Sequence, residues 1–397
     1  MHLRTLKDVK LNGKRVLMRV DFNVPLSKES GIVQDDTRIR AVLPTIRHIF
    51  ANGAKQLVLM SHLGRPRGQV VPGLSTKVVA ESLEKLLGER VKYVNECIGV
   101  GCDATDARIF MLENVRFHNE EKDCDESFAK KLAVHGDVFV NDAFAVCHRA
   151  ESSVTTVAEV MKSSGKPAVA GLLVEREMEM LEKVVKNPRS PFVMIVSGAK
   201  VDTKIGMMQN FYNTVDTFIL GGGIANTFLA AEGFNVAASL YEKDKVELAR
   251  EILLACQEHV NEVIMPVDAI VASELTAEAE TAHVPVEDVE GDMKILDIGS
   301  KSIDKCCEIL ANAEMIVWNG PVGVYEFSQF MTGTKRIAEA IAANKEATTV
   351  VGGGDTVDAI NRLGIPFDEY THVSTGGGAM VEFLGGKALQ GIQVLMS

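Results

Sequence analysis

Short runs of apolar, largely β-branched residues alternate with helical patterns along nearly the whole chain of 397 residues. This alternation is typical of βαβ units, in which helices connect parallel strands. We expect strands at residues 15–21, 55–61, 108–113, 137–141, 192–197, 217–220, 262–267, 315–318, 348–351 and 371–373. Helices are expected at 37–51, 76–87, 128–134, 243–259, 301–313, 333–343 and 355–362, and Pro44 should kink the first helix or end it early.

The length of the chain favours two domains, at about 150 residues for each. The segment 162–171, KSSGKPAVAG, is rich in Ser, Gly and Pro and is the expected joint between them. The predicted fold class is therefore α/β, with two doubly wound, Rossmann-like domains that have mostly parallel sheets and are joined by a hinge.

Composition excludes several classes of protein. The net charge of −12 argues against a general nucleic-acid binder. It also hides an asymmetry: residues 1–170 hold 25 Lys and Arg against 21 Asp and Glu, whereas the remainder holds 17 against 33. No apolar run has the roughly 18 residues of a membrane span, and the first residues lack the apolar core of a signal peptide. These absences predict a cytoplasmic location. The seven cysteines, which form no CxxC motif, agree with that prediction.

Unusual residues gather where the predicted strands end. DFN, SHLGR, ENVR and NDAF follow strands of the first half, and SGAK, GGG, WNGP, GGGDT and STGGG follow strands of the second. Doubly wound sheets bind ligands at the carboxyl ends of their strands. The sequence therefore predicts a ligand site in each half, with a cleft between the two.

Three glycine clusters, at 221–223, 352–354 and 376–378, follow predicted strands of the second half. Glycine allows the backbone to approach a ligand closely, and the N-terminus of a helix offers free N–H groups to phosphate. The clusters therefore favour phosphate binding. No P-loop motif occurs, and a faint GxGxxA at 99–104 is interpreted as a loop rather than a dinucleotide fingerprint.

Charged residues near these clusters suggest the chemistry. Asp355 stands at a helix start, where a carboxylate either caps the helix or binds Mg²⁺ together with nucleotide oxygens; we favour magnesium. Lys200 and Lys204 are four residues apart and could place cations on phosphates during phosphoryl transfer. In the first half, Arg38, His62, Arg65, Arg116 and Arg149, beside Asp21 and Asn23, are expected to form an anion pocket.

With these residues in place, the sequence resembles the phosphoglycerate kinase family along nearly its whole length. The motifs that carry the resemblance are RVDFNVP at 19–25, SHLGRP at 61–66, LENVRF at 112–117, VNDAF at 140–144, HRA at 148–150, GAKVDTK at 198–204, GGGIANTF at 221–228, WNGPVGVYE at 318–326, VVGGGDT at 350–356 and STGGGA at 374–379.

The resemblance implies a role for each matching residue. Asp21, Asn23, Arg38, His62, Arg65, Arg116 and Arg149 match the pocket for 3-phosphoglycerate, in a domain spanning 1–170. A second set of residues matches the family's nucleotide site, in a domain spanning 171–378: Lys204, Gly222, Asn319, Glu326, Gly353, Gly354, Asp355 and Thr356. Glu326 would bind ribose hydroxyls, and Asp355 would bind the Mg²⁺ of Mg-ATP or Mg-ADP. The groups implied in catalysis are Arg38, Lys200, Lys204, Gly376 and Gly377. Residues 379–397 are expected to pack back on the first domain.

The implied reaction is the reversible glycolytic transfer of a phosphoryl group between ATP and the carboxylate of 3-phosphoglycerate, which gives ADP and 1,3-bisphosphoglycerate. The implied protein is a monomer that binds neither nucleic acid nor membrane. The acceptor carboxylate, with a pKa of about 3.5–4, is ionised at neutral pH, so no general base is needed. Departures from the family occur at Glu151, where a histidine is usual, and at Ala145–Cys147, Ser300, Tyr325 and Gln390. They leave open a catalytically degenerate member that acts as a binding protein.

Overall fold

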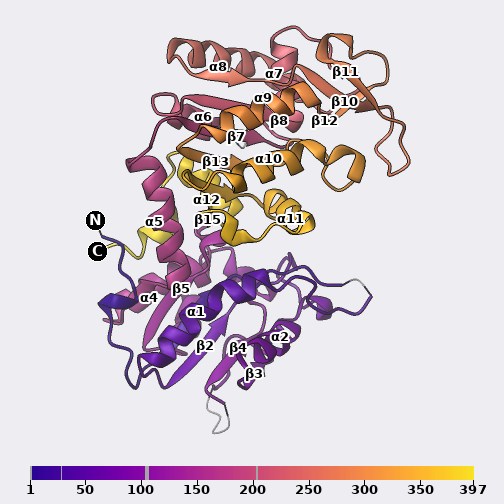
Figure 1. Cartoon of the computed structure of the whole chain (residues 1–397). Helices are drawn as coiled ribbons and strands as arrows, with labels where there is room; N and C mark the ends of the chain where they lie inside the picture. The colour runs from indigo at the N-terminus through magenta and orange to yellow at the C-terminus, as the bar shows by residue number, and fades with distance from the viewer. Residues whose placement is uncertain (1, 28, 103–106, 203) are drawn as a thin grey trace. The chain divides into compact units, whose positions relative to one another are not determined.

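The structure is a computed structural model that describes residues 2–27, 29–102, 107–202 and 204–397. The chain folds into two compact units: the N-terminal unit, Met1–Glu179 with Ala388–Ser397, and the C-terminal unit, Met180–Lys387 (Figure 1). The division falls inside helix α5 (Leu172–Lys186), nine residues beyond the boundary that the sequence suggests. Among the described residues, no helix combines the length and apolar character needed to cross a membrane.

The N-terminal unit is built on a six-stranded sheet in the order β3-β4-β2-β1-β5-β6, and all its strand pairs are parallel. Its strands are β1 (Arg15–Val20), β2 (Gln56–Met60), β3 (Val91–Val94), β4 (Ile109–Leu112), β5 (Val138–Asp142) and β6 (Ala168–Ala170). Its helices are α1 (Thr37–Ala51), α2 (Lys77–Leu87), α3 (Glu126–Ala133), α4 (Val157–Ser163) and, near the C-terminus of the chain, α13 (Gln390–Gln393). Strand β6 lies within the segment 162–171, so the Ser, Gly and Pro residues there mark a turn inside this unit and not the joint.

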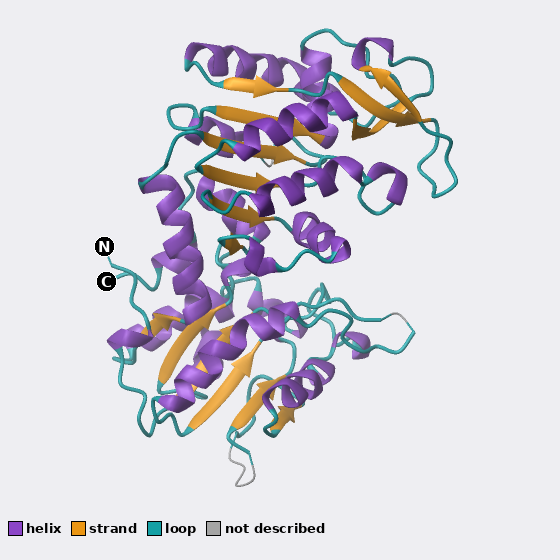
Figure 2. Cartoon of the chain, viewed as in Figure 1, coloured by secondary structure: helices purple, strands orange, loops and turns teal. Residues whose placement is uncertain are grey.

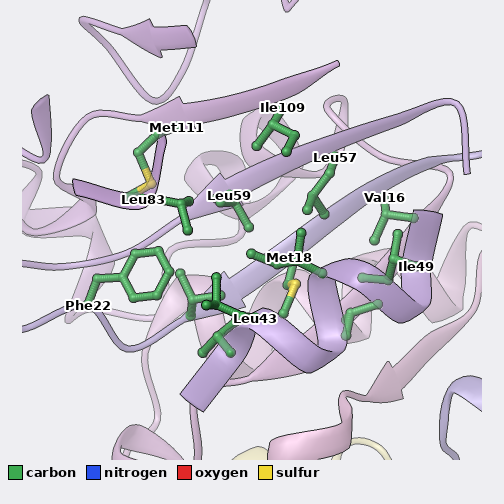
Figure 3. Close-up of a cluster of buried hydrophobic side chains, with 14 of the residues drawn as sticks. Val16, Met18, Phe22, Leu43, Ile49, Leu57, Leu59, Leu83, Ile109 and Met111 are labelled. Carbon is green, nitrogen blue, oxygen red and sulfur yellow. The ribbon is translucent and has the colours of Figure 1, made fainter. Parts of the chain in front are cut away.

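Helices cover the faces of this sheet (Figure 2). Val16, Met18 and Val20 of β1 belong to one apolar cluster with residues of α1 and α2, and Figure 3 shows several of these side chains meeting. Leu17 is equally buried but points to the opposite face, because successive strand residues alternate. Burial on both faces explains why the strands read as continuous apolar runs.

The C-terminal unit has a second parallel six-stranded sheet, in the order β15-β14-β13-β7-β8-β9. Its strands are β7 (Phe192–Ser197), β8 (Thr217–Gly221), β9 (Glu262–Ile264), β13 (Met315–Asn319), β14 (Thr348–Gly352) and β15 (His372–Val373). Its helices are α6 (Ile205–Phe211), α7 (Gly222–Ala231), α8 (Val246–Glu258), α9 (Ser300–Ala311), α10 (Thr332–Ala343), α11 (Gly354–Leu363) and α12 (Gly377–Leu384). Two Rossmann-like units with mostly parallel sheets confirm the predicted fold class.

A small antiparallel sheet in the C-terminal unit is not anticipated from the sequence. It consists of β10 (Asp268–Ala272), β11 (Ala282–Pro285) and β12 (Lys294–Ile298), in the order β11-β10-β12. The single strand predicted at 262–267 is therefore wrong in extent: β9 ends at Ile264, and β10 begins in the other sheet at Asp268. Pro266 lies between them, and proline cannot donate a hydrogen bond to a continuing strand.

Helix α1 corrects the expectation for Pro44, because the helix continues past it to Ala51. Pro44 is exposed, whereas its neighbours Leu43 and Thr45 are buried. The carbonyl group that loses its helical partner at Pro44 therefore lies on the solvent side, where water can satisfy it. Burial of the opposite face is sufficient to keep the helix intact.

Two further expectations concern the C-terminal tail and the GxGxxA segment. Residues 388–397 belong to the N-terminal unit, as expected for the tail, but α12 belongs to the C-terminal unit. Of the GxGxxA segment at 99–104, the last two residues lie outside the described residues. Because each main sheet is parallel, its strands all end at one edge, and that edge carries the motifs considered next.

Candidate functional site

In the N-terminal unit, the predicted cationic residues follow the carboxyl ends of neighbouring strands. Asp21 follows β1, His62 follows β2, and Arg116 lies in the short 3₁₀ turn Val115–Phe117 after β4. Arg149 follows β5 by seven residues, and Arg38 lies in the first turn of α1. Since β4, β2, β1 and β5 are adjacent in the sheet, the topology brings these segments to one edge.

A connected network of polar contacts joins most of these residues. Arg38 forms an ion pair with Asp21, and His62 Nδ1 lies 3.8 Å from Asp21 Oδ1. His62 Nδ1 also lies 3.1 Å from Arg19 Nη2. Arg116 Nη1 donates to the Gly64 carbonyl at 3.3 Å, which attaches Arg116 to the SHLGR turn.

Burial separates this cationic cluster, which is the predicted anion pocket, into a buried base and an exposed rim. Arg38 and Arg149 have side chains 35% and 44% exposed, and Arg65 is exposed as well, so these three can meet an anion from solvent. Arg116 and His62 are buried beneath them. Burial, and then the positive charges of Arg19 and Arg116, hold the pKa of His62 well below its ordinary value. His62 is therefore a neutral hydrogen-bonding group at neutral pH.

Asn23 has a supporting place in this pocket. Its side-chain oxygen accepts a hydrogen bond of 2.8 Å from the Gly64 backbone N–H. Gly64 has a φ of +66°, and a Cβ there would lie 2.8 Å from a methyl group of Leu74. Asn23 thus fixes the tight turn that carries Arg65.

Sequence reasoning missed three residues at the base of the pocket: Arg19, Glu121 and Ser153. Arg19 is fully buried, and its Nε donates to Ser153 Oγ at 2.7 Å. Ser153 Oγ in turn donates to Glu121 Oε1 at 2.5 Å. Burial raises the pKa of Glu121 to about 7. The available signal was Arg19 itself, a charged residue within the apolar run VLMRV.

In the C-terminal unit, a cavity of about 800 Å³ opens at the strand ends. Gly222 and Gly223 of α7 line it beside Glu326 and Asp355, both of which are exposed. Its other walls include Leu240 and other apolar residues, which no motif indicated. The size and mixed lining suit a ligand with a flat apolar group and a polar tail.

Lys204 lies directly before α6 and is partly buried. Its Nζ donates to the Asn319 carbonyl at 2.9 Å and also to the Ser197 carbonyl. Burial lowers the pKa of Lys204 to about 8, against the opposing effect of Asp355. Gly320 makes this arrangement possible, because its φ is +103° and a Cβ would lie 2.9 Å from Lys204 Nζ.

The glycine loops after β14 and β15 pack against each other. A Cβ on Gly377 would lie 2.9 Å from the Gly353 Cα, so backbone meets backbone at this point. Asn319 Nδ2 donates to the Gly352 carbonyl at 2.8 Å, and Thr356 Oγ1 accepts from the Gly320 N–H at 2.8 Å. Both side chains are buried, so in this structure Asn319 and Thr356 hold the loops together.

The other predicted residues lie around these loops. Gly376 is the N-cap of α12, and Gly354 is the first residue of α11, open to solvent. Lys200 is exposed in the SGAK segment. The Asp355 side chain is exposed and lines the cavity, so its carboxylate oxygens are accessible as ligands for a hard cation.

A separate group of possible metal ligands, Glu96, Cys97 and His118, lies in the N-terminal unit, with ligand atoms within 4.8 Å of one another. His118 Nε2 and Glu96 Oε1 are 2.8 Å apart and already form a hydrogen bond. Burial raises the pKa of the Cys97 thiol far above its ordinary value, so the thiol is neutral. These contacts satisfy the group without an ion.

The sheet of the N-terminal unit carries cationic side chains at its strand ends, and the sheet of the C-terminal unit carries glycine loops, a lysine and an exposed carboxylate. Both sets of groups suit chemistry that positions and neutralises phosphates. Such chemistry is that of a phosphotransferase. The sequence model described as phosphoglycerate kinase matches residues 6–387. The chain belongs to the phosphoglycerate kinase family.

Individual relatives agree with this assignment. The chain is 45% identical to phosphoglycerate kinase of Dictyoglomus turgidum, over 98% of this chain and 97% of the relative, and 47% identical to that of Moorella thermoacetica, over 98% of each. It is similar in structure to phosphoglycerate kinase from Coxiella burnetii, with a TM-score of 0.87, 37% identity and 99% of each chain covered. The corresponding values for the Pyrococcus horikoshii enzyme are 0.84, 32%, and 99% and 98%.

The family is one of enzymes that transfer a phosphoryl group reversibly between ATP and the carboxylate of 3-phosphoglycerate, in glycolysis. Membership favours an active enzyme over a degenerate binding protein.

Proposed function

We propose that the chain performs this transfer with 3-phosphoglycerate bound by the N-terminal pocket and a magnesium nucleotide bound in the C-terminal cavity. The observation that carries the proposal is the cavity itself, whose lining brings together Gly222, Glu326 and Asp355 from three separate motifs. We further propose that the protein acts as a monomer in the cytoplasm.

In the N-terminal pocket, Arg38, Arg65 and Arg149 supply positive charge from the rim. Arginine can hold a phosphate or carboxylate through two parallel hydrogen bonds, which fixes both position and orientation. The neutral imidazole of His62 and the amide of Asn23 support the pocket by hydrogen bonding. Asp21 keeps Arg38 in place before a ligand arrives.

In the C-terminal cavity, Glu326 is assigned to the ribose hydroxyls, and the apolar wall around Leu240 to the base. Asp355 would hold Mg²⁺ together with nucleotide oxygens, and the ion would neutralise phosphate charge. The N–H groups at the starts of α11 and α12 face phosphate oxygens. Asn319 and Thr356 support the site indirectly, because they hold these loops in place.

Transfer needs no general base, because the acceptor carboxylate is ionised at neutral pH. Arg38 and Lys204, with the backbone of Gly376 and Gly377, are assigned to the migrating group, and Lys200 attends it from the SGAK segment. Their contribution is positioning and charge stabilisation, which account for most of the catalysis in phosphoryl transfer.

Asp355→Asn tests the magnesium assignment. The variant is expected to weaken binding of Mg-ADP by about tenfold or more, because the amide removes a negatively charged ligand for the ion. Binding of ADP without magnesium should change little. Isothermal titration calorimetry with and without Mg²⁺ measures both values.

Asp368→Asn is the matched control, since it removes one exposed negative charge from the same unit. Equal weakening of ADP binding with and without magnesium in Asp355→Asn would contradict the assignment.

The lowered pKa of Lys204 predicts a pH dependence. Below about pH 8 the free enzyme carries a protonated Lys204, and above it the positive charge is lost. We expect kcat/KM for Mg-ATP to fall by about tenfold per pH unit above that value, since kcat/KM reports groups of the free enzyme.

Lys204→Arg should lose this limb of the pH profile, because arginine stays protonated. A wild-type profile that is flat up to pH 10, or the same limb in Lys204→Arg, would show that Lys204 does not cause it.

A further inference from the structure

Glu151 places a negative charge inside the cationic pocket of the N-terminal unit. Its side chain is 4% exposed and faces three guanidinium groups. Oε1 accepts a hydrogen bond from Arg116 Nη2 at 2.8 Å and lies 4.0 Å from Arg149 Nη1. Oε2 lies 3.9 Å from Arg19 Nη2.

The contacts of Glu151 indicate that its carboxylate mainly balances positive charge and does not form a fully hydrogen-bonded ion pair. Within the described part of the chain, the buried Oε2 atom accepts no hydrogen bond, and neither does the buried Arg116 Nε donate one. Arg19 has a second carboxylate nearby, that of Glu121. A buried charge that is incompletely hydrogen-bonded is expensive to keep, so stability alone is a poor explanation for a carboxylate here.

Arg149 is the link between Glu151 and a ligand. Its side chain is 44% exposed on the rim, while Glu151 lies beneath it at 4.0 Å, outside hydrogen-bonding range. An anion bound by Arg149 and the carboxylate of Glu151 are therefore both attracted to the same guanidinium group, and they repel each other.

We propose that Glu151 is a positioning residue that sets the net charge of this pocket and thereby limits its affinity for 3-phosphoglycerate. The inference rests on the proposed function, which places 3-phosphoglycerate in this pocket. Weaker ground-state binding is useful to an enzyme, because binding shared equally by substrate and transition state does not raise kcat. The carboxylate also holds Arg116 in its buried position.

Glu151→Gln removes the charge but keeps an oxygen that can accept from Arg116. In titration calorimetry of the full-length chain, we expect the Kd for 3-phosphoglycerate to fall by roughly tenfold. That is the size of effect for one unit charge several ångströms away, at an effective dielectric constant between those of protein and water. The dependence of log Kd on log salt concentration should become steeper, because the pocket gains net positive charge.

Two controls accompany this variant. Glu159→Gln removes an exposed carboxylate from the same unit and should leave both the Kd and the salt dependence unchanged. The Kd for Mg-ADP should also be unchanged in Glu151→Gln, since its cavity lies in the other unit. A purely structural role of Glu151 would leave the salt dependence as it is in the wild type.

An unchanged or raised Kd in folded Glu151→Gln would overturn the inference. If this variant does not fold, Glu151→His at pH 8, where the imidazole is uncharged, tests the same prediction. Arg65→Ala separates the two levels of the argument. If wild type and Arg65→Ala bind 3-phosphoglycerate equally, the proposed pocket is wrong; if Arg65→Ala binds weakly but Glu151→Gln does not bind more tightly, only the role of Glu151 is wrong.

Discussion

Lys204→Ala is expected to lower kcat by about 10²–10³-fold while it changes the Kd for Mg-ADP only a few-fold, judging by the loss of single transition-state donors in other enzymes. The resting structure gives the reason. Lys204 Nζ is partly buried and donates to two backbone carbonyls, those of Ser197 and Asn319, at the ends of β7 and β13. Its charge is therefore held in place beside the glycine loops before any ligand binds.

A coupled assay that follows ATP-dependent use of 3-phosphoglycerate through NADH measures kcat, and calorimetry measures the Kd. Lys305→Ala is the control, because Lys305 is an exposed lysine of the same unit that pairs only loosely with Glu262 at 3.4 Å. Near-normal turnover of Lys204→Ala, or a loss explained entirely by weaker nucleotide binding, would contradict the catalytic role.

Arg38→Ala is expected to have an effect of similar size, about 10²–10³-fold on kcat, with a much smaller change in KM for 3-phosphoglycerate. Arg38 is partly exposed and is held by Asp21, so its guanidinium group is oriented by the protein and remains accessible to a ligand. A charge of this kind stabilises the transferring group more than the bound substrate, which already has the other arginines as partners.

Arg40→Ala is the matched control for Arg38→Ala. Arg40 lies two residues further along α1 and makes an exposed ion pair with Asp36 at 2.7 Å, so its removal should cost little. If Arg38→Ala raised KM strongly and left kcat unchanged, Arg38 would be a binding residue and the assignment to the migrating group would be wrong.

Much of the fold could be predicted because local patterns were clear. Strand β7 and helix α1 have the predicted bounds, and the other predicted strands, except the one at 262–267, agree to within one residue at each end, since strands buried on both faces read as unbroken apolar runs. The short strands β3 and β6 and the small antiparallel sheet were missed. Their sequences are brief or interrupted by charged residues, and their pairing depends on segments far away in the chain.

The candidate site divides in the same way. Motifs at strand ends pointed to His62, Arg65, Arg116 and Arg149, and parallel topology was enough to expect them at one edge. The motifs could not indicate which of these residues are buried. Nor could they reveal that Arg19 connects His62 with Ser153, because that contact joins residues 134 positions apart in the sequence.

The sequence by itself determined the chain's class and its family. It also determined which residues supply positive charge and glycine loops at the strand ends, because the strands and the motifs that follow them can be read in order along the chain. Only the tertiary structure decided which groups are charged and which side chains hold the loops and turns of the site in place. Burial makes His62 neutral and lowers the pKa of Lys204 to about 8, and it places the carboxylate of Glu151 among three arginines. These properties depend on desolvation and on distances between atoms, and both come into existence only when separate segments pack together.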